Sequence, residues 1–115
     1  MRRLFVAIIA VGIFIVPAAG MAGQDKDLVA KGEKVYAANK CVTCHSIGAK
    51  GNKKGPLDEV GSKYTAEELR KWMTHPADMT AKTKSTRKPL MKPYDKLSAQ
   101  DLDALVAYMQ TLKKK

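Results

Sequence analysis

The chain has 115 residues, 28% of them charged and 45% hydrophobic, and its formal net charge at pH 7 is +10. A chain of this length forms one small domain with a modest core of its own, which excludes a large multidomain enzyme. A basic chain could suit nucleic acid, but the first residues predict export, and an exported protein is a poor candidate for that partner.

The N-terminal segment has the three parts of a secretory signal. Arg2 and Arg3 precede an uninterrupted apolar run at residues 4–16, and small residues follow as far as Ala22. We expect residues 1–22 to be a signal peptide and residues 23–115 to form a periplasmic domain with 19 basic and 11 acidic residues, a net charge of +8. Because residues 4–22 are nineteen positions without a charge, the alternative is a retained membrane anchor.

The domain begins with an amphipathic helix that starts near Asp25. Gly32 lies on its apolar face, one turn before Tyr36, and this face also contains Leu28, Val29 and Val35. Glycine lowers helix propensity by about 1 kcal/mol relative to alanine. We therefore interpret Gly32 as the point of a close crossing with another helix.

The next segment, Cys41-Val42-Thr43-Cys44-His45, contains the only two cysteines of the chain in the pattern C-x-x-C-H. Two thiols at this spacing can form thioether bonds with the two vinyl groups of one haem, and the adjacent imidazole can then bind the iron. The pattern therefore predicts covalent haem attachment.

Three other interpretations of the two cysteines are weaker. A closed zinc site needs two more ligands at a matching spacing, and only His45 and His75 remain. A redox dithiol belongs to a strand-containing unit, and the sequence has no convincing strand pattern. A simple disulfide in an exported protein would leave the apolar pattern with no cofactor to surround.

A short helix is predicted in the middle of the domain. It starts at Thr65, includes Trp72 and ends near His75, because Pro76 follows. Residues 79–90 show no clear helix.

The last helix starts at Ser98, which forms a capping pair with Asp101. Its apolar face contains Leu102, Leu105, Val106, Met109 and Leu112. We expect this face to pack against the first helix at Gly32.

Two of the six methionines lie in the export segment and two lie on apolar helix faces, where methionine usually fills the core: Met1, Met21, Met73 and Met109. Met79 and Met91 remain, both in segments predicted to be irregular and able to fold over the far face of a haem. His75 is a competing ligand, although a histidine directly before a proline at a helix end more often caps the helix.

Several pieces of the sequence occur in the order of a known family. They are Gly32 and Tyr36, the cysteine pentapeptide, Gly55-Pro56-Leu57, the run Met91-Lys92-Pro93-Tyr94, and the final helix as far as Tyr108. On these residues the chain resembles a bacterial class I cytochrome c. The resemblance implies a small all-α fold in which the N- and C-terminal helices pack together around one covalently bound haem.

The resemblance also implies which residues hold the haem. Cys41 and Cys44 would attach it, and His45 would be the proximal iron ligand. The second ring nitrogen of His45 would donate to the carbonyl oxygen of Pro56.

On the other face of the haem, the resemblance favours Met91 as the sixth ligand over Met79 and His75. Met91 precedes the final helix, as the methionine of the family does. Trp72 would pack against the haem or donate its indole N–H to a propionate; the alternative is a simple core residue, which is the more common role of a large aromatic on a helix face.

Eight basic residues come from the loops that flank the two expected ligands, and we call them the basic surface: Lys50, Lys53, Lys54, Lys82, Lys84, Arg87, Lys88 and Lys92. Such a surface would steer an acidic redox partner toward the haem edge. The simpler interpretation is a solvated surface that keeps the protein soluble.

The resemblance implies an exported, monomeric carrier of single electrons that performs no bond chemistry. Two alternatives belong to other classes. One is a haem protein with an open or weakly filled sixth position, acting as a small-molecule sensor or a peroxidase-like enzyme. The other is a cytochrome subunit held permanently in a larger redox enzyme.

Overall fold

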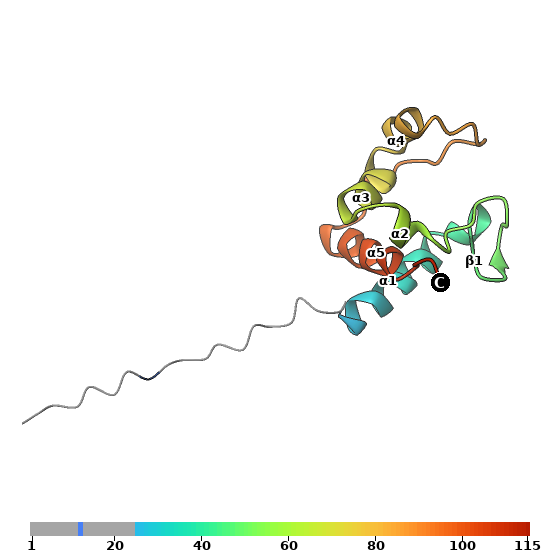
Figure 1. Ribbon diagram of the computed structural model, residues 1–115. Helices are drawn as coiled ribbons and strands as arrows, with labels where there is room; N and C mark the ends of the chain where they lie inside the picture. The colour runs from blue at the N-terminus through green and yellow to red at the C-terminus, as the bar shows by residue number, and fades with distance from the viewer. Residues whose placement is uncertain (1–11, 13–24) are drawn as a thin grey trace, which may run out of the picture.

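The computed structural model describes residue 12 and residues 25–115. The predicted signal segment, residues 1–22, lies outside the described residues except for residue 12. Helices form nearly all of the regular structure (Figure 1): α1 (Lys26–Ala38), the 3-10 turn η1 (Cys41–Thr43), α2 (Val60–Lys63), α3 (Ala66–Thr74), α4 (Pro76–Thr83) and α5 (Ala99–Gln110). The prediction of an all-α domain is confirmed.

Within residues 25–115, and at residue 12, the structure contains no helix with the length and apolar character needed to cross a bilayer.

The three longer helices begin at the capping residues that the sequence predicts. The side chain of Asp25 accepts a hydrogen bond from the N–H of Asp27, 2.9 Å away, at the start of α1. Thr65 caps α3 and Ser98 caps α5 in the same way, each over a donor three residues ahead. Each cap satisfies an N–H group that a helix end otherwise leaves without a partner.

α1 and α5 make the most extensive contact between any two elements of the described chain, and they lie side by side in Figure 1. Gly32 is buried where they cross. A Cβ at this position would lie 2.7 Å from the carbonyl carbon of Ala104 and 2.7 Å from the Cβ of Tyr108. The rings of Tyr36 and Tyr108 pack edge to face beside the crossing, with centroids 5.8 Å apart. The predicted close crossing at Gly32 is confirmed.

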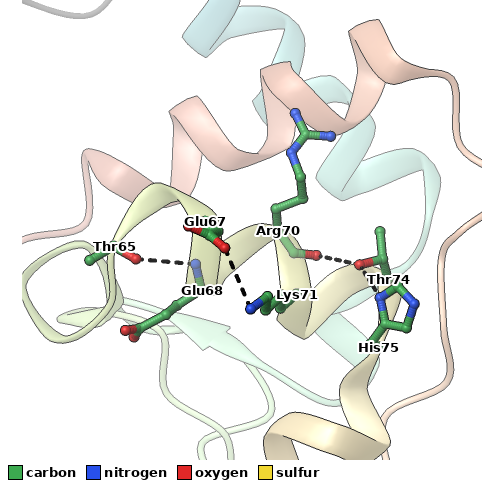
Figure 2. A network of polar contacts seen from close by, with 7 residues as sticks. All are labelled: Thr65, Glu67, Glu68, Arg70, Lys71, Thr74 and His75. Atoms are coloured by element: carbon green, nitrogen blue, oxygen red, sulfur yellow. Dashed lines mark hydrogen bonds and ion pairs between the residues drawn. The ribbon is translucent and has the colours of Figure 1, made fainter.

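α3 packs across α5 and completes the core. The core contains Val35, Tyr36, Leu69, Met73, Leu102, Leu105, Val106 and Met109. Figure 2 shows the polar side of α3, where Arg70 extends toward α5 and Glu67 forms an ion pair with Lys71. The guanidinium of Arg70 also pairs with Asp103 of α5, and the distance between Glu67 and Lys71 is 3.5 Å. These exposed contacts leave the apolar side of α3 free to face the core.

The prediction that residues 79–90 contain no clear helix is wrong over the first part of that range, because Pro76–Thr83 forms α4. Pro76 prevents α3 from continuing. It also occupies the first position of α4, where a missing N–H costs nothing. His75 therefore ends one helix and precedes the next. α4 stops at Lys84, whose φ of 54° lies in the left-handed region.

Two short strands, β1 (Ser46–Ile47) and β2 (Lys50–Gly51), form an antiparallel hairpin that the sequence did not predict. Strands of two residues are too short to show an alternating pattern. An isolated parallel bridge joins Ser46 to Pro56, so the chain returns alongside β1 after the hairpin. This return brings residues 55–57 next to the cysteine segment.

Candidate functional site

A cavity of about 920 Å³ opens among the helices α1 to α5 and the loops between them. This volume lies within the ~300–1,000 Å³ typical of ligand and cofactor sites. The structure brings all six sequence-predicted site residues into its lining: Cys41, Cys44, His45, Pro56, Trp72 and Met91. Core side chains complete the wall, among them Tyr36, Leu69, Met73, Leu105 and Met109.

The cysteine segment is a compact turn. Lys40 takes a left-handed conformation, with φ 54°, and turns the chain out of α1 into η1. The N–H groups of Cys44 and His45 both donate to the carbonyl of Cys41, at 3.1 and 2.9 Å. Both cysteines are free thiols, and burial raises the pKa of Cys41 to about 11. The turn therefore presents two free thiols and an imidazole to one cavity.

The hydrogen-bond partner of His45 lies one residue earlier than the resemblance implied. His45 Nδ1 is 3.1 Å from the carbonyl oxygen of Gly55, so Pro56 is not the acceptor. The N–H of Ser46 also donates to Gly55, while the N–H of Leu57 donates to the carbonyl of Ser46. Successive carbonyls of an extended chain point to opposite sides. The bridge to β1 therefore turns the carbonyl of Gly55, and not that of Pro56, toward the ring.

This hydrogen bond determines which ring nitrogen of His45 carries the proton. A carbonyl oxygen can only accept, so Nδ1 donates and Nε2 keeps its lone pair. Burial lowers the pKa of His45, the hydrogen bond to Gly55 acts in the opposite direction, and the nearby charge of Arg87 lowers the pKa further. A neutral ring with a free Nε2 is the form that binds a metal.

Met91 reaches the cavity from the segment between α4 and α5. Its side chain is half-buried and packs against the core. Three residues later, the N–H of Tyr94 donates to the carbonyl of Met73 over 2.6 Å, which ties this segment to α3. The thioether of Met91 and the imidazole of His45 thus line one cavity although they come from distant parts of the chain.

The two competing ligands do not line this cavity. Met79 is only 2% exposed and belongs to α4, so it does not lie in the irregular segment predicted for it. His75 is exposed at the junction of α3 and α4, and its Nδ1 lies 2.8 Å from the hydroxyl oxygen of Thr74, as Figure 2 shows. Their positions favour Met91 as the sulfur donor.

Two polar groups of the cavity wall are buried without a hydrogen-bond partner among the described residues: the hydroxyl of Tyr36 and the indole N–H of Trp72. Burial raises the pKa of Tyr36 to about 12, so its hydroxyl remains a donor at neutral pH. A buried donor without a partner costs ~1–3 kcal/mol. Acceptors such as haem propionates would remove this cost. The two donors, two thiols, imidazole and thioether together fit a covalently bound haem.

Arg87 was grouped with the exposed lysines in the sequence analysis, but it lines the cavity together with Lys92. Its guanidinium donates to the carbonyl of Cys44, from a residue 43 positions away in the chain. The other members of the basic surface are exposed. In the sequence, only the residue type distinguishes Arg87 from the seven lysines of the basic surface. Arginine suits a fixed hydrogen-bonding geometry better than lysine does.

Comparison with known proteins gives a family and one relative. The family model for cytochrome c matches residues 29–113. The chain is 30% identical over 95 residues to cytochrome c oxidase subunit 2 of Alkalihalophilus pseudofirmus, in an alignment that covers 75% of this chain. The alignment covers 26% of that relative, so the chain spans about a quarter of its length. No solved structure matches the chain.

Proposed function

Because this chain belongs to the cytochrome c family, we propose that it is an exported monohaem electron carrier whose iron is held by His45 and Met91. Cytochrome c domains carry covalently bound haem and transfer electrons, so the chain is a haem-binding electron-transfer protein. One observation carries the finer proposal: a single cavity collects Cys41, Cys44 and His45 from one segment and Met91 from another.

Cys41 and Cys44 would form the thioether bonds, and His45 would bind the iron through Nε2. When bound, haem supplies an iron that gains and loses one electron. Gly55 holds the imidazole in one orientation through Nδ1 and keeps Nε2 free of a proton. The proposed role of these residues is to fix the position of the haem within the cavity.

Met91 would supply a soft thioether as the second iron ligand, which favours ferrous iron and would raise the reduction potential. The hydroxyl of Tyr36 and the indole N–H of Trp72, which have no other partner among the described residues, would donate to polar groups of the haem. The apolar wall, which includes Leu69 and Leu105, excludes water. Exclusion of water lets the residues around the iron, and not solvent, set its potential.

Covalent attachment is the first property to test. Protein produced together with a haem-attachment system is expected to have the mass of the chain plus one haem, and to keep its colour after unfolding in guanidinium chloride. Changing both Cys41 and Cys44 to alanine should abolish the covalent haem, because no other thiol exists. The control is Thr43→Ala in the same turn, which should load normally. Wild-type protein that releases its haem on unfolding, or never acquires it, would contradict the proposal.

We further propose that the basic surface guides acidic redox partners to the haem. The hairpin that carries Lys50 and the segment after α4 that carries Lys88 both lie on the right of Figure 1, and Arg87 links the second segment to Cys44, two residues before the hairpin. Clustered charge of one sign raises the association rate of an oppositely charged partner by about 10- to 1,000-fold at low salt.

This steering predicts a local salt dependence of electron transfer. Oxidation of the reduced protein by the anion hexacyanoferrate(III), followed by stopped flow, should slow as ionic strength rises. At low salt, Lys53→Glu combined with Lys88→Glu should slow it by roughly 3- to 10-fold. The control is Lys26→Glu combined with Lys34→Glu on α1, which changes the net charge equally without touching the basic surface. Equal slowing in the two double variants would mean that net charge alone controls the rate, and it would contradict steering by the basic surface.

A permanent subunit of a larger redox enzyme is the second candidate function, and the likeness to a protein named as an oxidase subunit supports it. The two candidates differ in solution behaviour. A free carrier elutes from gel filtration at the size of one domain, whereas a subunit co-purifies with its enzyme from the native source.

A further inference from the structure

Arg87 differs from every residue around it. In residues 81–90, Arg87 is the one half-buried residue and the other nine are exposed, although Thr83, Ser85, Pro89 and Leu90 also line the cavity. Its guanidinium crosses to the cysteine segment and donates to the carbonyl of Cys44. In this exposed stretch, Arg87 is therefore the residue that connects the chain after α4 to the wall that carries His45.

The same guanidinium lies against Gly55. A Cβ at Gly55 would fall on the Nη1 and Cζ atoms of Arg87, so the absence of a side chain at Gly55 makes room for the arginine. Gly55 is also the residue whose carbonyl accepts from His45 Nδ1 and from the N–H of Ser46. Arg87 thus touches both backbone segments that fix the imidazole.

Met91 stands between two anchors of its segment. Arg87, four residues before it, is fastened to the carbonyl of Cys44. Tyr94, three residues after it, is fastened to the carbonyl of Met73 on α3. The two residues directly before Met91, Pro89 and Leu90, line the cavity but are exposed, and Leu90 is 51% exposed. Removing the first anchor would leave this end of the segment free to move away from the cavity.

We infer that Arg87 is a positioning residue that holds the thioether of Met91 over the site by fastening its segment to the wall that carries His45. This inference rests on the proposed ligation by His45 and Met91. A charge-assisted hydrogen bond contributes more than a neutral one, and the planar guanidinium can span Cys44 and Gly55 in a way that the single ammonium of lysine cannot. Without this contact, an added ligand competes more successfully with the thioether for the iron.

The test is an imidazole titration of the ferric holoprotein, followed in the visible spectrum. Arg87→Ala is expected to raise the apparent affinity for imidazole by about tenfold or more, the effect of losing one hydrogen bond to a charged group. Its sulfur-to-iron absorption band should weaken before any imidazole is added. Arg87→Lys should fall between Arg87→Ala and the wild type. The matched control is Lys88→Ala, which removes the same charge from the neighbouring exposed position and should leave the affinity unchanged.

Met91→Leu provides the reference for a site without the thioether and should bind imidazole most tightly. If Met91→Leu increases the affinity and Arg87→Ala does not, the role of Arg87 is refuted while the proposed ligation stands. If Arg87→Ala shifts only the reduction potential, and Arg87→Lys restores it, Arg87 is a counter-ion of the haem and the positioning role is refuted. If Met91→Leu binds imidazole no better than the wild type, the proposed ligation itself fails.

Discussion

Replacing Met91 with leucine is expected to abolish the weak long-wavelength sulfur-to-iron band of the ferric protein and to lower its reduction potential. Leucine has nearly the volume of methionine, so the cavity wall stays filled while the sulfur is lost. Loss of a soft ligand removes a preference for ferrous iron. We expect a fall of at least ~60 mV, which corresponds to a tenfold change in that preference for a one-electron couple. Visible spectra and a redox titration measure both quantities.

The matched control is Met79→Leu, which changes the other methionine left open by the sequence. Met79 is buried on α4 and does not line the cavity. The sulfur-to-iron band and the reduction potential of the Met79→Leu protein should therefore stay near the wild-type values. A band that survives in Met91→Leu and disappears in Met79→Leu would reverse the assignment. A wild-type protein with a high-spin spectrum and no such band would instead support an open site, as in a sensor or a peroxidase-like enzyme.

Gly32→Ala is expected to destabilise the domain by about 2 kcal/mol or more, although alanine improves helix propensity by about 1 kcal/mol. The added methyl group would meet the backbone of Ala104 and the Cβ of Tyr108, and backbone atoms cannot move aside without shifting α5 against α1. Guanidinium unfolding of the holoprotein, monitored by circular dichroism, measures the loss.

The control for this substitution is Lys34→Ala, two residues further along α1 and exposed. Its effect should stay within about 0.5 kcal/mol, as is usual for surface positions. Equal stability of Gly32→Ala and Lys34→Ala would mean that the helices can separate at no cost, contrary to the packing at Gly32.

Much of the fold could be predicted because its signals are local. Asp25, Thr65 and Ser98 each cap a helix a few residues ahead, and Gly32 interrupts an apolar face. α4 was missed because Pro76 is compatible with two outcomes, the end of one helix and the first position of the next. Choosing between them depends on how the burial of Met79 stabilises the second helix, which is a tertiary effect.

The residues of the candidate site also separate into those with a local sequence signal and those without one. The C-x-x-C-H pattern identifies Cys41, Cys44 and His45 on chemistry alone, and the structure places all three at one cavity. The roles of Gly55 and Arg87 depend on the return of the chain past β1 and on a contact between residues 43 positions apart. Neither relation leaves a periodic or motif signal in the sequence.

The close packing of α1 against α5 also implies an order of assembly. Synthesis proceeds from the N-terminus, so the C-x-x-C-H segment emerges 46 residues before Met91 and still further ahead of α5. Until Ala99–Gln110 follows, the face of α1 around Gly32 lacks its main partner. The thiols of Cys41 and Cys44 are therefore accessible on an open chain before the last helix arrives to close the domain. The proposed covalent attachment can precede the final docking step, and α5 would then enclose a group that is already attached.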